Sequence, residues 1–297
     1  MPGCSKAQRV APHMREMPRQ QLRFCKMSGA GNDFILINAA SAPLLREPSA
    51  LAAALCPRRT SVGADGVILV EPSERTDADV RVRFWNPDGG ETETCGNGTR
   101  CAARFAFIEG LARDKMMIET KGSDIAAYVS GPLVTLRYAI KPSLAPDLTV
   151  TGAEGTRRGH LVEVGVPHLV VQVASMPNGA IEPICRPLRY APELGEAGAN
   201  VNLVEIVDRR AIRIRTYERG VEEETLACGS GSLSSALALC AAGQLESPVS
   251  VETRSGCVLT VRFQRETDGS FSQLELEGPA QVVYWGEIAD SDLPPLC

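Results

Sequence analysis

The chain has 297 residues, with 31 basic and 36 acidic side chains and a formal net charge of −5. Its 44% hydrophobic and 23% charged residues indicate a globular protein of one large or two medium domains, and exclude disordered, collagen-like and coiled-coil chains. The apolar stretches are far shorter than the ~20 residues of a membrane-spanning helix, and the mild acidity argues against a nucleic-acid binder.

Ten cysteines are more than a chain of this size usually carries, but too few for a disulfide scaffold. The N-terminus lacks an apolar signal core, so we expect a cytoplasmic location and reduced thiols. No C-x-x-C pair occurs, and the imidazoles are limited to His13, His160 and His168. We therefore expect no metal site.

Regular structure is expected from residue 22 onward, because residues 1–21 mix prolines with basic residues and show no hydrophobic period. These residues are predicted to form a flexible N-terminal extension. Helical spacing of apolar residues predicts helices over 98–111, ended by Gly110, and over 231–242. Strands are predicted over 34–37, 67–70, 80–85, 116–119, 133–138, 161–164, 169–173, 212–217, 249–252, 258–263 and 274–277.

The chain contains the same series of features twice: a strand, a polar turn, a Cys-Gly-x-Gly sequence and a helix. The cysteines of the two copies are 133 residues apart. Such an internal repeat predicts two similar domains related by a pseudo-two-fold axis, with a cleft between them. A boundary within residues 140–155 fits the proline and glycine content of that stretch. The repeated turns are Asn86-Pro87-Asp88-Gly89 with Cys95-Gly96-Asn97-Gly98, and Glu218-Arg219-Gly220 with Cys228-Gly229-Ser230-Gly231.

Each of these two cysteines is predicted to precede a helix N-terminus, where backbone N–H groups are unpaired and the helix dipole is positive. Such a turn binds carboxylates and makes a nearby thiolate more available. If the pseudo-two-fold axis brings the halves together, two thiols face one another across one bound anion. This arrangement suits removal of a proton from one face of a carbon beside a carboxylate and delivery of a proton to the other face, without pyridoxal.

Seven segments of this chain, in the same order, resemble the diaminopimelate epimerase family: 27–34, 63–66, 86–89, 95–100, 165–168, 200–202 and 218–231. The resemblance implies an α+β fold of two pseudo-symmetric domains, each a largely antiparallel sheet wrapped around a central helix. The domains would be residues 22–142 and 143–279, with 280–297 returning to the first. It also implies an isomerase of lysine biosynthesis that epimerises the α-carbon of diaminopimelate from LL to meso, with no cofactor.

The resemblance gives Cys95 and Cys228 the role of the catalytic acid/base pair, supported by His168 and Glu218. The planar guanidinium of Arg219 suits a distal carboxylate. The remaining matched positions would bind substrate. The α-carboxylate would be held by the backbone N–H groups of Gly96, Asn97, Gly229 and Ser230. The other matched substrate-binding positions are Asn32, Asn86 and Asn200.

At one position the sequence departs from the family, and this departure leaves more than one amino acid possible as the substrate. Val166 stands where the family often has Asn, which removes a hydrogen-bond partner for the distal end of diaminopimelate. A racemase or epimerase of another amino acid is therefore an alternative. A cysteine hydrolase or transferase using Cys228 with His168 is a second, and a silent ligand-binding protein a third. The expected partner is a small amino acid, with no nucleic acid or membrane, and a homodimer is left open.

The other eight cysteines are expected to be structural, and Cys101 and Cys240 lie on the apolar faces of the two helices. Arg213 and Arg215 alternate along a strand and are expected on its exposed face. Residues 222–224, three consecutive glutamates, are expected to form an exposed charged loop.

Overall fold

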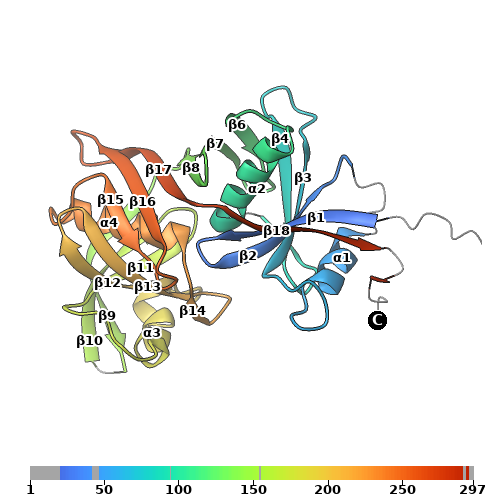
Figure 1. The fold of residues 1–297 in the computed structure, drawn as a ribbon. Helices are drawn as coiled ribbons and strands as arrows, with labels where there is room; N and C mark the ends of the chain where they lie inside the picture. The colour runs from blue at the N-terminus through green and yellow to red at the C-terminus, as the bar shows by residue number, and fades with distance from the viewer. Residues whose placement is uncertain (1–20, 42–46, 94, 154, 290–291, 294–297) are drawn as a thin grey trace, which may run out of the picture.

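The described strands form one hydrogen-bonded sheet of 18 strands, which folds into two lobes (Figure 1). The N-lobe, β1–β8 with β18, surrounds helix α2 on the right of the figure, and the C-lobe, β9–β17, surrounds α4 on the left. The expected N-terminal extension lies, except for Gln21, outside the described residues. The computed structural model describes residues 21–41, 47–93, 95–153, 155–289 and 292–293.

The N-lobe sheet is covered by a helix on each face, because its strands are apolar on both sides. In β2, Phe34 and Leu36 pack toward α2, whereas Ile35 and Ile37 pack toward α1. The elements are β1 (Gln21–Gly29), β2 (Asn32–Asn38), α1 (Pro48–Leu55), β3 (Gly66–Pro72), β4 (Val80–Trp85), β5 (Glu91–Thr92), α2 (Gly96–Ile108), β6 (Lys115–Glu119), β7 (Asp124–Ser130), β8 (Leu133–Tyr138) and β18 (Gln281–Ala289).

The C-lobe has the same plan, with α4 in its main core and α3 on the outer face, where Leu188 packs against Tyr217 and Leu203 in a second apolar cluster. Its elements are β9 (Ser143–Gly152), β10 (Gly155–Glu163), β11 (Pro167–Gln172), α3 (Glu182–Arg189), the 3-10 turn η1 (Pro192–Leu194), β12 (Asn200–Asp208), β13 (Ala211–Glu218), β14 (Glu223–Thr225), α4 (Gly229–Ala241), β15 (Val249–Glu252), β16 (Val258–Arg265) and β17 (Phe271–Pro279).

The strand pairings of the two lobes repeat in direction and order. In the N-lobe, β2 is parallel to β3, β3 is antiparallel to β4, and β4 is parallel to β6 across α2. In the C-lobe, β11, β12, β13 and β15 pair in the same directions across α4. Most of the remaining pairings are antiparallel, so the α+β fold with two pseudo-symmetric, helix-centred halves is confirmed.

The chain crosses between the lobes twice. After β8 it enters the C-lobe, where β9 pairs with β10, and after β17 it returns to the N-lobe, where β18 pairs with β1. The strands that precede the two crossings, β8 and β17, pair with each other and join the lobes. The relative position of the two central helices is therefore fixed by continuous backbone hydrogen bonding.

The predicted strands are all present, most of them within longer ones, but both helices begin two residues earlier than predicted, at Gly96 and Gly229. The reason is that the cysteine itself is the N-cap, so helix starts immediately after it. The stretch 140–155, expected as a boundary, contains the ten-residue strand β9.

The expected exposure was wrong for Arg215 and for Glu224, whereas Glu223 is exposed as expected. Arg213 is exposed, but Arg215 is only 6% exposed and forms two hydrogen bonds of 2.6 Å with Glu224. It also donates to the carbonyl oxygens of Pro177 and Gly179. The segment that follows β11 covers this end of β13, so exposure does not alternate along the whole strand.

Candidate active site

The two Cys-Gly-x-Gly turns have the same local geometry. Cys95 and Cys228 have extended backbone, with φ of −146° and −121°, and each is the N-cap of its helix. The Cys95 Sγ accepts from the Gly98 N–H at 3.5 Å, and the Cys228 Sγ accepts from the Gly231 N–H at 3.3 Å. Each thiol therefore lies at the positive end of a helix dipole, as the sequence predicted.

A side chain from the first turn reaches the backbone of the second. Asn97 Nδ2 donates to the carbonyl oxygen of Ala227 at 3.0 Å, and Ala227 directly precedes Cys228. The hydroxyl of Tyr138, on the joining strand β8, lies close to Gly96, and both thiols are near enough to it to raise its pKa. The structure thus brings the two helix N-termini of the repeat into one site.

Asn97 is held by a buried cation. Its Oδ1 accepts from the Arg100 Nη2 at 2.6 Å, and its Nδ2 also donates to Asn32 Oδ1 at 2.5 Å. Asn32, at the start of β2, in turn donates to Asp65 at 3.2 Å. The candidate binding residue Asn32 is therefore in direct contact with the first cysteine turn.

Ser230, the counterpart of Asn97, is held by a neutral histidine. His168 is fully buried, and its Nε2 lies 2.9 Å from Ser230 Oγ, which in turn lies 3.4 Å from Cys228 Sγ. The side-chain amide of Asn202 donates to His168 Nδ1 at 3.1 Å, because its Oδ1 accepts from Thr216. This network assigns the ring proton to Nε2, which donates to Ser230.

Burial dominates the ionisation of these groups. Burial raises the pKa of both Cys95 and Cys228, and the nearby Glu218 carboxyl raises them further; hydrogen bonds from the helix backbone oppose this. Burial lowers the pKa of His168 to about 3, so its ring is neutral at pH 7. The site is therefore dry enough to strengthen every charge interaction within it.

Glu218 and Arg219 lie at the end of β13, beside the second turn. The carboxyl of Glu218 accepts from Thr225 Oγ1 at 2.7 Å, and burial raises its pKa. The backbone N–H of Arg219 donates to Asn200 Oδ1 at 2.8 Å, and Asn200 Nδ2 lies 3.5 Å from the ring of His168. Within the described part of the chain, the Arg219 guanidinium forms no ion pair, which leaves it able to bind a carboxylate.

Two residues singled out in the sequence lie apart from this network. Asn86 is exposed in the turn after β4, and none of the described hydrogen bonds joins its side chain to the other candidates. Val166 is 36% exposed in the turn before β11, two residues from His168.

Sequence reasoning missed three residues of the site: Arg100, Tyr138 and Asn202. Arg100 lay within a segment quoted for the resemblance, but its position on a helix gave no sign that it is buried. Tyr138 was interpreted as the last residue of a strand, and Asn202 lay within the segment 200–202 quoted for the resemblance, with no role of its own. A polar residue in an otherwise apolar strand, as in Asn202, was the one signal available.

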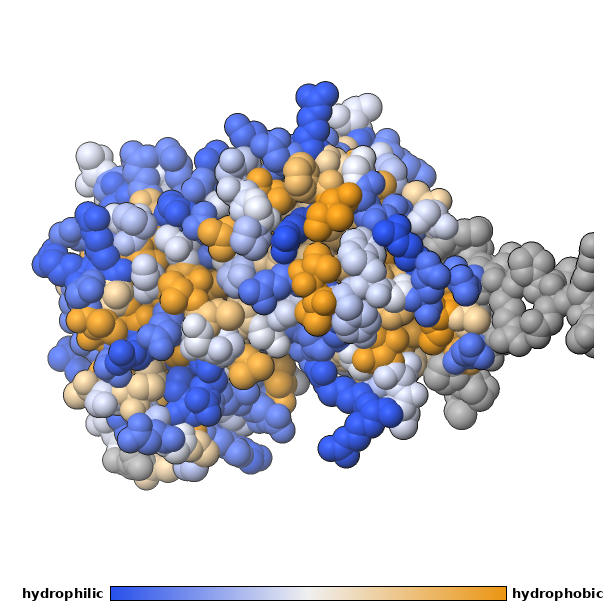
Figure 2. Space-filling model, viewed as in Figure 1, coloured by the Kyte–Doolittle hydropathy of each residue, from blue (hydrophilic) through white to orange (hydrophobic). Residues whose placement is uncertain are grey.

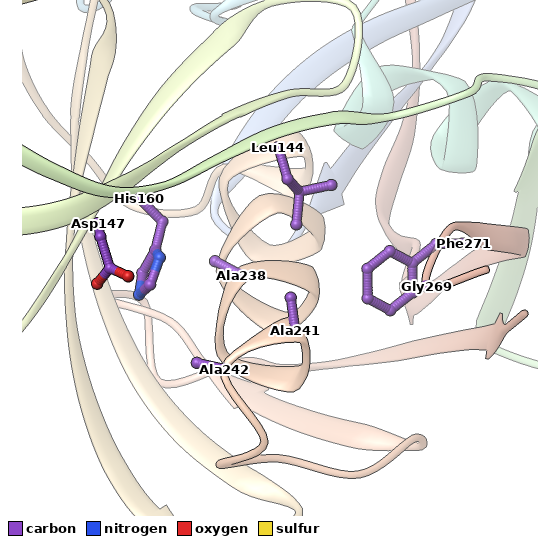
Figure 3. Close-up of a pocket in the computed structure, with 8 residues that line it drawn as sticks. All are labelled: Leu144, Asp147, His160, Ala238, Ala241, Ala242, Gly269 and Phe271. Carbon is purple, nitrogen blue, oxygen red and sulfur yellow. The ribbon is translucent and has the colours of Figure 1, made fainter. Parts of the chain in front are cut away.

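A cavity of about 510 Å³ lies elsewhere in the C-lobe, between β9, β10 and the end of α4 (Figure 3). Figure 3 shows His160 beside Asp147 on one side of it and Ala241 and Phe271 on the other. Because α4 has 13 residues, this cavity is roughly 18 Å from the capped end of the helix. His160, interpreted from the sequence as a residue without a catalytic role, contacts none of the described candidate site residues.

None of the described helices combines the length and apolar character that spanning a membrane requires. Seen from the side of Figure 1, the surface is largely hydrophilic, with separate groups of apolar residues (Figure 2). Among the described residues, no three His, Cys, Asp or Glu side chains cluster as metal ligands would.

The fold places the chain in a class of two-lobed proteins with paired, pseudo-symmetric halves. A PhzF-family phenazine biosynthesis protein from Bacillus anthracis aligns with a TM-score of 0.67 and 17% identity, over 90% of this chain and 99% of that one. A hydroxyproline epimerase from Agrobacterium vitis aligns with a TM-score of 0.64 and 16% identity, over 93% and 94%. At these identities the likeness establishes the fold alone.

The sequence identifies the family within this class. The family model described as diaminopimelate epimerase matches residues 24–132 and 160–283. Diaminopimelate epimerase from Aquifex aeolicus is 36% identical over 92% of this chain and 99% of its own length, and that from Chlorobaculum tepidum is 39% identical over 88% and 99%. The chain belongs to the diaminopimelate epimerase family, and it is an isomerase.

Proposed function

We propose that this protein interconverts LL- and meso-diaminopimelate, a step of lysine biosynthesis, by transferring protons between the α-carbon and the thiols of Cys95 and Cys228. The observation that carries the proposal is the hydrogen bond from Asn97 to the carbonyl of Ala227, which holds the two capped thiol turns side by side. Two thiols on opposite sides of one carbon are what inversion by two bases requires.

The substrate α-carboxylate would lie between the two helix N-termini. The backbone N–H groups of Gly96 and Asn97 on one side, and of Gly229 and Ser230 on the other, are positioned to donate to it. These dipoles are fixed before substrate arrives, so they stabilise the carbanion-like transition state without reorganisation. One cysteine removes the α-proton as thiolate, and the other donates a proton to the opposite face.

The polar residues of β11 and β13 would serve the rest of the substrate. Glu218, beside Cys228, and His168, behind Ser230, support the second thiol and the reacting amino group. The guanidinium of Arg219, which forms no ion pair with the described residues, would bind the distal carboxylate with its planar fork. Asn32 and Asn200 would hold the polar groups between, and Asn86 would approach from the turn after β4.

The rival hydrolase would need His168 to accept the proton of Cys228. His168 instead bonds to Ser230, and Asn202 occupies its other nitrogen, so the ring offers no free acceptor to the thiol. This arrangement favours the epimerase. The racemase of another amino acid stays open, because Val166 lies close to the substrate-binding strand and replaces a hydrogen-bonding residue.

Incubation with LL-diaminopimelate in deuterated water, followed by NMR, tests the proposal. We expect deuterium at the α-positions together with formation of the meso isomer. A panel of other amino acids run in parallel separates the rival racemase. A covalent acyl-enzyme mass without α-deuteration would contradict the proposal and favour the hydrolase.

Three further features remain predictions alongside this function. We propose two domains, residues 22–142 and residues 143–279, with residues 280–297 belonging to the first. We also propose a cytoplasmic location and a small amino acid as the binding partner. Whether the protein forms a homodimer is tested by measuring its molecular mass in solution.

A further inference from the structure

A buried arginine without an acidic partner lies behind the first cysteine turn. Arg100 is 0% exposed, and no carboxylate among the described residues pairs with it. Its Nη1 lacks any hydrogen-bond partner, although its Nη2 bonds to Asn97 and its Nε lies 3.5 Å from the carbonyl oxygen of Pro279. Burying a charge in this way costs several kcal/mol by general estimates, so the fold alone gives no reason for it.

The position of Arg100 on its helix makes the cost larger. It lies in the second turn of α2, and side chains of a helix lean toward the N-terminus, so its guanidinium lies near the positive end of the dipole. A second positive helix end, that of α4, is brought to the same place by the Asn97–Ala227 bond. Three positive features therefore converge where the cysteine turns meet, and only an anion would offset them.

We propose that Arg100 is a positioning residue for the Cys95 half of the site, whose buried positive charge favours the anionic forms of the bound carboxylate and of the Cys95 thiol, and whose bond to Asn97 fixes the two turns against each other. The catalytic meaning of this inference rests on the proposed epimerase function.

The charged and titratable groups around Cys95 and Arg100 are few. The Cys95 thiol is near Arg100 and near Glu218 from β13; burial and Glu218 raise the pKa of Cys95, and Arg100 lowers it. The groups facing the guanidinium from other elements are Tyr138, on β8, and Cys257, between β15 and β16, with Cys101 on its own helix. Burial raises the pKa of Tyr138 to about 12, so the Tyr138 hydroxyl is neutral at pH 7. Among these described groups, Arg100 is therefore the one with a full positive charge.

The chain contains a matched control one turn further along the same helix. Arg104 donates to the carbonyl oxygen of Ala280, the residue after the Pro279 carbonyl that faces Arg100. None of the described hydrogen bonds joins Arg104 to Asn97 or to the cysteine turns, and Arg104 is not among the charges that shift the pKa of Cys95. Arg104→Met therefore removes an equal charge and a similar backbone contact away from Asn97.

The test is the rate at which iodoacetamide alkylates Cys95 and Cys228 in the full-length protein between pH 6 and 10, read for each cysteine by peptide mass spectrometry. In Arg100→Met we expect alkylation of Cys95 at pH 7.5 to slow about tenfold, as loss of one charge within several ångströms implies, with an upward shift of its pH profile. Arg100→Lys keeps the charge and should stay within about threefold of wild type. Arg104→Met should match wild type.

Thermal unfolding separates this role from a structural one. Because removal of an unpaired buried charge relieves its desolvation, Arg100→Met should be as stable as wild type or more stable. If it does not fold, Arg100→Gln provides a second variant: it removes the charge, its side-chain amide can still donate to Asn97 Oδ1, and it should slow alkylation of Cys95 in the same way.

Wild-type alkylation of Cys95 at every pH in the folded Arg100→Met or Arg100→Gln variant would overturn the inference. So would equal slowing at Cys95 and Cys228, since the effect would then not be specific to the Cys95 half of the site. The alkylation assay needs no substrate. A wild-type enzyme that does not epimerise diaminopimelate would therefore refute the proposed function and leave the test of Arg100 intact.

Discussion

The two cysteine turns share a backbone and differ in what lies behind them. Behind the first, a buried cation holds Asn97, and a charged group of Lys26, Asp33, Arg58 and Asp65 leads to its partner Asn32. Behind the second, the neutral chain Thr216–Asn202–His168 holds Ser230.

The difference shows which part of the repeat is constrained by its chemistry. Both halves keep a thiol at a helix N-terminus, because in the proposed mechanism each binds the carboxylate and moves a proton. The third residue of the turn is held by a charged group in one half and by neutral hydrogen bonds in the other. The asymmetry lets the two thiols differ in acidity, which suits a reaction that begins with one thiolate and one thiol.

The largest expected effect is loss of either thiol. Cys95→Ala and Cys228→Ala should each lower stereoinversion by about 10²–10⁴-fold, since one proton-transfer group is removed. The remaining thiolate still reaches one face of the α-carbon. One variant should therefore exchange deuterium slowly into the LL isomer and the other into the meso isomer, as measured by NMR.

The same exchange pattern in both cysteine variants would contradict the assignment of the two thiols to opposite faces of the α-carbon. If both exchange deuterium into the same isomer, the thiols do not lie on opposite faces of the substrate. The double variant, which should exchange neither isomer, is the control for background exchange.

A second prediction concerns the close packing behind the second turn. A Cβ on Gly231 would lie 2.4 Å from Asn202 Oδ1, so Gly231→Ala must displace the amide that orients His168. We expect a loss of about 1–3 kcal/mol in unfolding free energy, although alanine in a helix normally stabilises. At Gly96 the Cβ would lie 3.2 Å from the movable hydroxyl of Tyr138, and Gly96→Ala should change stability little. Urea unfolding of both variants checks the difference.

Much of the fold was predictable because its signals are local. The apolar strands, the two central helices and the repeated Cys-Gly-x-Gly follow from patterns within a few residues of each other, and the structure contains them all. The helix α3, with Pro187 inside it, and the strand β9, which lies within the stretch expected as a boundary, carry weak local signals and form through tertiary packing.

The part of the candidate site that was predictable is its two cysteine turns, which the hydrogen bond from Asn97 to Ala227 joins. Arg100 and Asn202 lie behind these turns, and whether an arginine on a helix is buried or exposed depends on the strand packed against it. That information lies about 180 residues away, at Pro279, and no local pattern contains it.

A third prediction uses the charged group behind the first turn. Burial would raise the pKa of Asp33, but hydrogen bonds from Arg58 and Lys26 lower it from 3.8 to about 2. A carboxyl with a depressed folded pKa stabilises the protein above the unfolded value, and this stabilisation is lost as the pH falls from about 4 to 2. Asp33→Asn should remove this pH dependence, worth about 1–2 kcal/mol because Arg58 is partly screened by water.

Unfolding by urea at pH 2.5, 4 and 6 measures this effect. Asp77→Asn, which breaks an exposed pair with Arg75, is the control: the hydrogen bond from Arg75 also lowers the pKa of Asp77, but water screens the pair, so the acid dependence should change much less than in Asp33→Asn. An unaltered acid dependence in Asp33→Asn would show that the N-lobe site does not depend on its charged support.

The smallest expected effect tests whether each thiol depends on its own supporting residues. Ser230 lies 3.4 Å from the Cys228 thiol and helps to lower its pKa against burial and Glu218. Ser230→Ala removes one neutral hydrogen bond, worth about 1 kcal/mol, so alkylation of Cys228 at pH 7.5 should slow about fivefold while that of Cys95 is unchanged. Ser232→Ala is the matched control, because its hydroxyl donates to the Cys228 carbonyl at 2.8 Å and not to the sulfur. Slowing at Cys95 instead would mean that the two turns act as one electrostatic unit, because a neutral group on one side would then control the thiol on the other.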